Sequence, residues 1–488
     1  MRSKIYTIIA VLLILAFAAA LRIDTFWLPH NHGDQIYYLG LAMKLENSGL
    51  KDYNLKGLNV LSDKNQNILA VVPSEDKDKG ELLTELEKDG VRYYSMQSIS
   101  NMPPAYSFLL MLSHKIFSPN KEYLSVNRNL GLNAFAARPK PFFHAQFYAV
   151  WINFAFSLLL ILVVFLLGKA FFNEQVGLWA ALLMSITPVN ILTSQRLWAD
   201  DMTALFSALG VLLFWQGRKK NNLVFTILSG LSVGIAALTK GTGLFIIAVI
   251  FFSVIIIEMR QVINKYLLSS LCVICAIIIH SLKDKGLIIS GVILFLVILL
   301  ELIRKKNRTW ARNVLLNKHL ILFITISVAA CAFWYTKLFL TYGNIAGSVK
   351  QDDLWEAASW FKTLKKRNPF GQLYYFVYLS PLFLLFYIEA VKTIIKKFFS
   401  QERIVLLVWF AMFMVLLIPS REERYMLPAY PAIAILSAVA IENIRIWLNK
   451  RCSVGNIVVF ALFLITSVWS IRIALHVVYS NGAIFAIK

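Results

Sequence analysis

Acidic and basic side chains gather in four short polar stretches between long apolar segments of this chain. These stretches hold Asp34, then Arg196 with Asp200 and Asp201, then Lys240, and finally Arg421 with Arg424. A carboxylate can take a proton from a hydroxyl group, and lysine or arginine can bind a phosphate. Together these residue types predict a substrate that carries a phosphate anion and a group to be deprotonated. A sugar linked to a lipid phosphate fits that description.

The second stretch, RLWADDM, places two carboxylates side by side in a short turn between apolar segments. Because adjacent carboxylates repel each other, Asp200 and Asp201 suit a catalytic base, a cation or a hydroxyl-rich ligand. A purely structural interpretation is also open. Asp200 could be the N-cap of the following helix, and Asp201 could interact favourably with the dipole of that helix.

The third and fourth stretches supply positive charge. Lys240 lies in ALTKGTGLF, where flanking glycines allow the backbone to approach a ligand closely. Arg421 and Arg424 lie in PSREERYMLPAYP, and the guanidinium fork matches the geometry of a phosphate. The alternatives are a lysine that extends toward water from a turn, and arginines that pair with neighbouring glutamates in a solvated turn. Asp34 itself could be a surface loop residue.

Long apolar segments must position these residues. The chain has 488 residues, of which 58% are hydrophobic and 16% charged, whereas a soluble domain carries about 25% charged residues. About thirteen segments of roughly 15 to 23 residues have uncharged centres and predict membrane-spanning helices. They begin near Ile5, Ala145, Val176, Met202, Asn221, Gly241, Tyr266, Gly286, His319, Gly371, Ile404, Tyr425 and Val454.

The formal net charge of +22 comes from basic residues that are mostly clustered between apolar segments. Such clusters indicate membrane topology and anionic lipid headgroups rather than nucleic acid. Their asymmetry predicts an N-terminus inside the cell and a C-terminus outside. The four polar stretches then lie on the extracytoplasmic face. Cys272 and Cys275 form a CxxC spacing inside an apolar run, which favours buried thiols over a redox or zinc site.

The predicted organisation has five parts. Residues 1–23 form the first transmembrane helix, 24–144 a large extracytoplasmic loop, 145–342 transmembrane helices 2–9, 343–370 a second such loop, and 371–488 transmembrane helices 10–13. Within the first loop, residues 34–46 predict a helix, and 102–117 an amphipathic helix at the membrane interface. A small insertion at about 50–100 contains a strand-like run at 68–72 and a helical run at 81–88.

Five segments, taken in order, resemble a known family. They are GDQIYYLGLAMKL, PPAYSFLLMLSHKIF, ALLMSITPVNILTSQRLWADDMTALFSALGVLLF, GLSVGIAALTKGTGLFII and RYMLPAYPAIAILSAVAI. They resemble the polyprenyl-phosphate-sugar-dependent glycosyltransferases of the GT-C fold, in the branch of protein O-mannosyltransferases and lipid A aminoarabinose transferases. The resemblance implies an all-α multi-span membrane protein that transfers a sugar, with inversion, from a polyprenyl-phosphate donor to a hydroxyl group.

The resemblance also implies roles for individual residues. Asp34 matches the first-loop aspartate that acts as the base on the acceptor hydroxyl. The second family carboxylate lies in RLxxPD, and alignment on Arg196 gives its place to Asp201, with Asp200 replacing the proline. Lys240 would help to hold the donor phosphate. The other residues assigned to the substrate or donor phosphate are Arg424, Arg421, Arg196, Tyr38 and Tyr106.

Two departures affect the acceptor and the cofactor. Gln35 stands where the family often has an acidic residue, and the insertion at about 50–100 has no family counterpart. His32 with Asp34 could assist a divalent cation, although solvated loop histidines are the simpler interpretation and the family branch is described as metal-independent. The acceptor is a glycan, lipid or protein hydroxyl. A prokaryotic plasma membrane is the expected location.

Two other interpretations are a polytopic lipid or solute transporter or flippase and an inactive scaffold. Transporters usually carry ionisable residues near the middle of the bilayer, whereas this chain places them at span ends. Retention of both Asp34 and Asp201 argues against a scaffold.

Overall fold

The computed structural model describes residues 2–23, 34–53, 58–62, 68–73, 86–88, 91–96, 102–117, 147–259, 316–342, 383–395, 400–417, 423–452 and 455–479. The first half of this structure contains α1 (Arg2–Ile23), α2 (Asp34–Ser48), α3 (Pro104–Phe117), α4 (Phe147–Phe171), α5 (Glu174–Ser185), α6 (Pro188–Ser194), α7 (Asp200–Lys220), α8 (Leu223–Thr239) and α9 (Phe245–Met259). The second half contains α13 (Lys318–Tyr342), α17 (Phe383–Ile395), α18 (Gln401–Leu417), α19 (Tyr430–Cys452) and α20 (Gly455–Tyr479).

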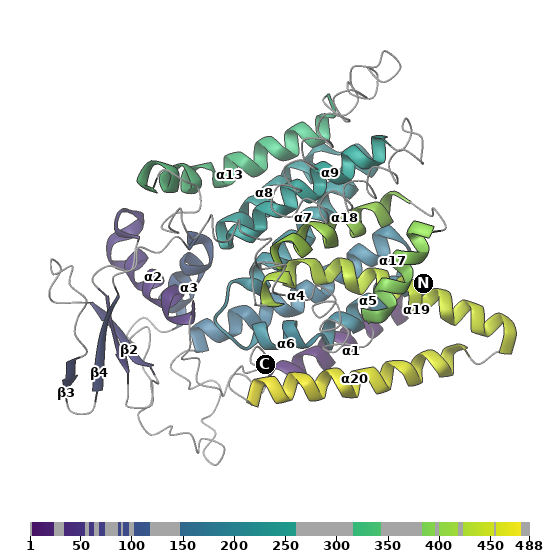
Figure 1. Ribbon diagram of the computed structural model, residues 1–488, viewed down its shortest axis with the longest axis horizontal. Coiled ribbons are helices and arrows are strands. Elements are labelled where there is room, and N and C mark those ends of the chain that lie inside the picture. Colours follow the sequence, from purple (N-terminus) through teal and green to yellow (C-terminus); the bar gives the residue numbers. More distant parts are fainter. Residues whose placement is uncertain are drawn as a thin grey trace, which may run out of the picture.

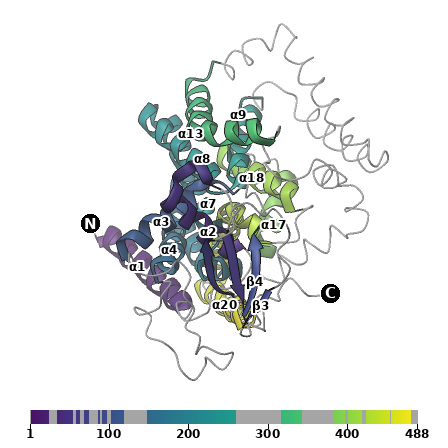
Figure 2. The ribbon, with the colours of Figure 1, turned by 90° about the vertical axis from the view of Figure 1, so that its left-hand side faces the viewer.

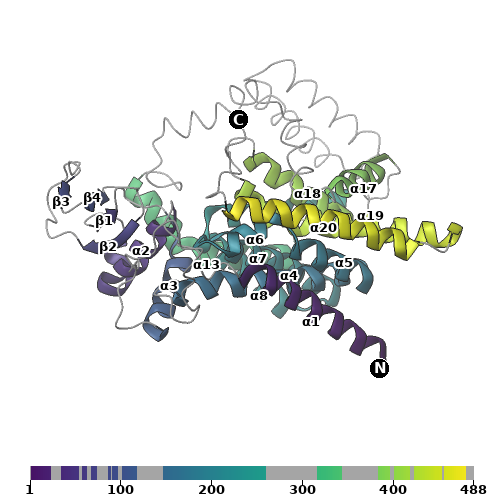
Figure 3. The ribbon, with the colours of Figure 1, turned by 90° about the horizontal axis from the view of Figure 1, so that it is seen from below.

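The helices form a bundle in which α4, α5, α7 and α8 are central. Helix α7 packs against α8 and α4, α8 packs against α13, and α5 packs against α19 (Figure 1). Helices α1 and α20 lie along the side of the bundle away from α13 (Figure 3). This arrangement confirms the predicted multi-span helical fold class.

Within the described residues, six helices are long and apolar enough to cross a membrane, and the bent pair α5–α6 is a possible seventh. The predicted spans near Tyr266 and Gly286 lie outside the described residues. The predicted span near Val176 is broken, because α5 and α6 meet at an angle of 60°. Pro188 stands at the first turn of α6, where it ends the backbone ladder of α5 and starts a new helix.

The first long loop contains a small antiparallel sheet in addition to α2 and α3. Its strands are β1 (Leu58–Ser62), β2 (Ile68–Pro73), β3 (Leu86–Lys88) and β4 (Val91–Met96), in the order β2-β1-β4-β3. The sheet lies beside α2 at one end of the bundle (Figure 1), and it faces the viewer when the molecule is seen from that end (Figure 2). The predicted strand at 68–72 is confirmed, but the predicted helical run at 81–88 is wrong at its end. Residues 86–88 pair with β4 as a strand, and cross-strand pairing therefore overrides the helical pattern there.

Helix ends that carry polar residues gather at the end of the bundle that faces α3. Two 3-10 segments lie beside the α6–α7 turn. They are η4 (Gly241–Leu244), which contacts α7 and α8, and η7 (Glu423–Ala429), which contacts α6 and α7. Helix α8 ends at Thr239, and the C-cap residue Lys240 has an extended backbone. Gly243 then packs on α8 so closely that an added Cβ would lie 2.3 Å from the carbonyl carbon of Ala236. Only glycine, which has no Cβ, lets η4 fold back against the last turn of α8 this closely.

The buried apolar residues form two cores. The larger core runs along the bundle helices, and its members include Phe214, Trp409 and Tyr430. The smaller core joins α2 and α3 to the α6–α7 turn, with Tyr106 and Leu197 fully buried in it. The first-loop helices are therefore packed onto the segment that carries Asp200 and Asp201.

Candidate functional site

The α6–α7 turn is shaped by one buried amide. Asn153 of α4 donates hydrogen bonds to the carbonyl oxygens of Trp198, at 2.8 Å, and of Arg196. Its Oδ1 accepts a bond of 2.9 Å from the hydroxyl of Tyr106 in α3. The ring of Tyr38 in α2 meets the ring of Tyr106 edge-on, with centroids 4.9 Å apart. The predicted substrate residues Tyr38 and Tyr106 are thus buried, and they support the turn.

Asp201 lies in the first turn of α7 and is fully buried. Its Oδ1 accepts hydrogen bonds from Nδ2 of Asn190 at 2.7 Å and from Oγ1 of Thr193 at 3.1 Å. Its Oδ2 has no hydrogen-bond partner among the described residues. A buried carboxylate oxygen without a partner is costly, so its place in the fold requires an explanation.

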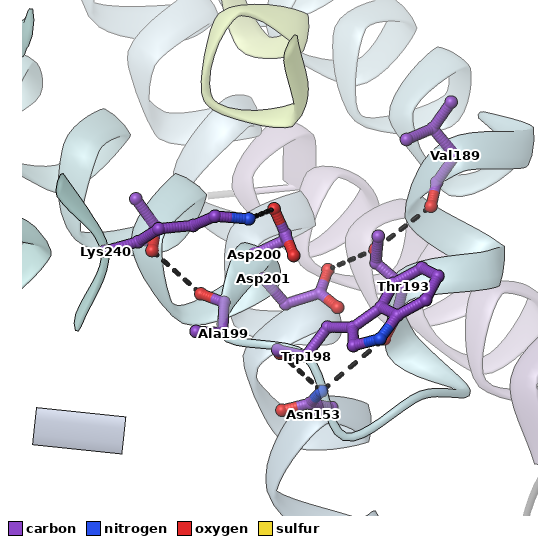
Figure 4. A network of polar contacts seen from close by, with 9 residues as sticks. Asn153, Val189, Thr193, Trp198, Ala199, Asp200, Asp201 and Lys240 are labelled. Atoms are coloured by element: carbon purple, nitrogen blue, oxygen red, sulfur yellow. Dashed lines mark hydrogen bonds and ion pairs between the residues drawn. The ribbon is translucent and has the colours of Figure 1, made fainter. Parts of the chain in front are cut away.

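The carboxylate of Asp200 is directed toward Lys240, whereas that of Asp201 is directed toward Thr193 (Figure 4). The Nζ of Lys240 lies 2.7 Å from Oδ1 of Asp200, and the two side chains are 14% and 2% exposed. Asp200 is the first residue of α7, and the N-cap position belongs to Ala199, which makes no side-chain capping bond. The N-cap interpretation of Asp200 is therefore wrong. The charge of Lys240 compensates Asp200 instead.

A second cation stands beside the first. The guanidinium of Arg424, in η7, lies 4.3 Å from the ring centre of Trp198 and 5.3 Å from that of Tyr425. The Nζ of Lys240 lies 4.1 Å from the same Tyr425 ring. The two cations are thus held on the faces of aromatic rings, which attract positive charge. Arg424 is only 6% exposed, so it does not belong to a solvated turn.

Arg196 is buried in the α6–α7 turn beside these residues. Burial lowers the pKa of its guanidinium below the ordinary value, because the charged form loses water. The structure thus brings Asp200, Asp201, Lys240 and Arg424 to one end of the bundle, as the sequence predicted.

Other predicted site residues are placed less completely. Asp34 begins α2, but its side chain lies outside the described residues, as do Arg421, His30 and His32. Among the described side chains, no group of three His, Cys, Asp or Glu residues is arranged to hold a metal ion.

Sequence reasoning missed five residues of the site. They are Arg22, Asn153, Asn190, Trp198 and Tyr425. A signal was present for the two asparagines and Arg22, because polar residues within apolar helices require partners. The partners themselves are set by packing between distant segments.

Comparison with known proteins adds a family match. The family described as dolichyl-phosphate-mannose-protein mannosyltransferase matches residues 136–280, which contain Asn153, Asp200, Asp201 and Lys240. No curated relative matches the chain by sequence.

Solved structures show the same fold. The apo oligosaccharyltransferase of Archaeoglobus fulgidus superposes with a TM-score of 0.55 at 12% identity, covering 99% of this chain and 56% of that one. The GT-C fold predicted from the sequence is confirmed. The same archaeal enzyme with an inhibitory peptide and a dolichol-phosphate gives a TM-score of 0.51 at 12% identity, with coverages of 99% and 56%. Its complex with Zn and sulfate gives 0.51 at 14% identity, with coverages of 95% and 53%. The chain therefore spans little more than half the length of the enzyme it matches.

Proposed function

We propose that this protein is a membrane glycosyltransferase that moves a sugar from a polyprenyl-phosphate donor to a hydroxyl acceptor on the extracytoplasmic face. The observation that carries the proposal is the meeting of Lys240 and Arg424 with Asp200 and Asp201 at one end of a multi-span GT-C bundle. The family match over residues 136–280, which hold Asp200, Asp201 and Lys240, supports a dolichyl-phosphate-mannose type of donor. The dolichol-phosphate bound by the archaeal enzyme of the same fold supports it as well.

The two cations are assigned to the donor phosphate. Transfer breaks the bond between the anomeric carbon and a phosphate oxygen, and negative charge grows on that oxygen. Lys240 and Arg424 offer an ammonium and a guanidinium, both held against the Tyr425 ring. Since both side chains are largely buried, water screens their charges weakly.

The carboxylates are assigned to the attack of the acceptor hydroxyl on the sugar. Asp34 takes the proton of the acceptor hydroxyl, whose oxygen attacks the anomeric carbon from the side opposite the phosphate. A carbon–oxygen bond forms to the acceptor as the bond to phosphate breaks. The products are the glycosylated acceptor, with inverted configuration, and polyprenyl phosphate. Asp201, with its Oδ2 lacking a described partner, is the second carboxylate of the site.

A divalent cation is a candidate cofactor in addition. The archaeal oligosaccharyltransferase of the same fold was crystallised with Zn. In this chain Asp34 and His32 are the side chains that the sequence offers to such an ion. Asp200 and Asp201 are bound to different partners, so they do not form a chelating pair as they stand.

The test is sugar transfer by the purified protein in lipid vesicles with a panel of polyprenyl-phosphate sugars and hydroxyl acceptors. The wild type is compared with Asp34→Asn, and released polyprenyl phosphate is measured. We expect Asp34→Asn to lose about 100-fold or more in kcat while still binding donor, because a general base is removed. Glu87→Gln, in strand β3 of the first-loop sheet, is the matched carboxylate control and should keep wild-type kcat.

A different result would favour the transporter. If no donor releases polyprenyl phosphate with any acceptor, yet labelled lipid or solute crosses the vesicle membrane, the glycosyltransferase proposal fails. Binding of donor without either activity would instead favour an inactive scaffold.

A further inference from the structure

One buried side chain outside the proposed reacting groups joins the first membrane helix to Asp201. Asn190, in α6, is fully buried. Its Nδ2 donates to Oδ1 of Asp201 at 2.7 Å, and its Oδ1 accepts from Nη2 of Arg22 at 2.6 Å. The amide therefore stands between a guanidinium and a carboxylate and bonds to both.

Arg22 is itself fully buried at the end of α1, and its position is defined by several helices. Its Nε donates to Oγ of Ser157 in α4 at 2.7 Å. Its Nη1 donates to the carbonyl oxygen of Ala18 at 2.9 Å and to that of Ser185, the last residue of α5, at 3.0 Å. With these bonds and the bond to Asn190, the guanidinium ties together α1, α4, α5 and α6.

The orientation of the Asn190 amide follows from these contacts. Its Oδ1 accepts from Arg22 and also from Oγ of Ser157 at 3.0 Å. Two donors on the oxygen leave the NH2 group to face Asp201. A reversed amide would bring NH2 against the guanidinium and an oxygen against the carboxylate. Only the observed orientation satisfies all partners.

We propose that Asn190 is a positioning residue that, held by Arg22, directs the Asp201 carboxylate. Its bond and that of Thr193 both go to Oδ1. Oδ2 of Asp201, which has no hydrogen-bond partner in the part of the chain that the structure describes, is then the oxygen directed to substrate. Arg22 is also the second-last residue of α1, and Asp34 follows it by twelve residues in the sequence. The network thereby joins the end of α1 to the direction of the Asp201 carboxylate. This inference rests on the proposed function.

The decisive variant is Asn190→Asp. It keeps the size of the side chain, and its carboxylate can pair directly with Arg22. It removes the N–H donor to Asp201 and places a like charge against that carboxylate. If Asn190 only holds Arg22, Asn190→Asp should retain wild-type transfer. If Asn190 directs Asp201, we expect kcat to fall about 10- to 100-fold with donor KM changed less than about threefold, since misplacement of a reacting group by about 1 Å has such effects.

Asn443→Asp is the matched control. Nδ2 of Asn443, in α19, contacts Oε2 of the buried Glu389 at 3.4 Å, so the substitution also sets an acid against a buried acid. Asn443 lies thirteen residues beyond Tyr430, about 20 Å along a helix from the site end of α19. Its variant should keep wild-type kcat. A kcat loss of similar size in both variants would show that any such buried repulsion disturbs the protein, and the proposal would fail.

A second measurement does not depend on activity. Thermal unfolding is followed for Asn190→Ala, Asp201→Asn and the double variant. Direct coupling predicts that Asn190→Ala lowers Tm by at least about 2 °C more in the presence of Asp201 than in its Asn variant. Additive shifts in Tm would overturn the positioning role, even if the wild type transfers sugar. Non-additive shifts in a wild type that transfers nothing would instead retain the network and reject the proposed function.

Discussion

The Nζ of Lys240, at the end of α8, lies 2.7 Å from Oδ1 of Asp200, at the start of α7. Forty residues separate them in the chain, and α7 and α8 run between them as a packed pair. Their ends return to the same point because α7 ends at Lys220, and the left-handed backbone of the next residue, Asn221, turns the chain into α8. The pair therefore joins two helix ends and at the same time sets the cation beside Tyr425.

Lys240→Gln tests whether this lysine binds donor or only neutralises Asp200. The single variant leaves a buried carboxylate without its cation, which costs about 3 kcal/mol of unfolding free energy. Adding Asp200→Asn removes that charge and should restore much of the stability. Donor binding should stay at least about 10-fold weaker in both variants, because the phosphate has lost an ammonium. Thermal unfolding and donor KM, measured on the same samples, separate the two effects.

Lys169→Gln is the control for Lys240→Gln. Lys169 also pairs with a carboxylate, that of Glu174 at 2.8 Å, and lies 5.7 Å from the ring centre of Phe165. It is at the far end of α4 from Asn153, about 24 Å away along the helix. We expect its donor KM to equal that of the wild type. If the double variant regains wild-type KM, Lys240 serves Asp200 alone and binds no phosphate.

Arg424 is expected to contribute a guanidinium fork as well as a charge. Arg424→Lys keeps the charge but loses the planar group that lies 4.3 Å from the ring centre of Trp198. We predict a rise in donor KM of about 3- to 10-fold for Arg424→Lys and about 10- to 100-fold for Arg424→Gln. Arg451→Gln is the matched control, because Arg451 lies 4.5 Å from the ring centre of Trp447 at the other end of α19. Equal effects of the Lys and Gln variants would contradict a role for the fork.

The sequence predicted the helical fold class and the gathering of the three stretches that hold Asp200, Lys240 and Arg424, because apolar span length and charge at span ends are local properties. The place of Asp34 beside them stays a prediction. It did not predict that Asp200 and Asp201 would face different partners. Their directions depend on Lys240, forty residues away, and on Asn190, across the α6–α7 turn. The strand at 86–88 was missed for a different reason. It pairs with β4, which begins only three residues after Lys88, and the Asp89-Gly90 pair between them is a local hairpin signal that the helical pattern concealed. Trp198 and Tyr425 could not be recognised as aromatic partners of a cation from the sequence, because the position of Arg424 over their rings is set by tertiary packing.

Chelation should leave transfer within about twofold of its starting rate. The proposed site already holds two cations for the leaving phosphate, so charge compensation is available from the chain. The measurement is sugar transfer after treatment with EDTA and removal of the chelator by gel filtration. A loss that Zn²⁺ or Mn²⁺ reverses would add a metal ion to the site. His32→Ala would then be the variant that tests whether the ion lies beside Asp34.

Two glycines next to Lys240 give the sharpest test of how the lysine is positioned. An added Cβ at Gly243 would lie 2.3 Å from the carbonyl carbon of Ala236, so Gly243→Ala must push η4 away from α8. The nearest atom to an added Cβ at Gly241 is the hydroxyl oxygen of Tyr335, at 3.9 Å, which is ordinary contact. Gly243→Ala should lower Tm and raise donor KM about 10-fold or more, since Lys240 moves with the segment.

Gly241→Ala should change neither quantity measurably, because its site has room and its backbone is that of an ordinary residue. Both variants add one methyl group, at positions two residues apart, so effects common to any substitution in this segment cancel. Wild-type donor KM in Gly243→Ala, together with a lowered Tm, would mean that the segment moves without disturbing donor binding. In that case the phosphate lies elsewhere, and the assignment of Lys240 to the donor must be withdrawn.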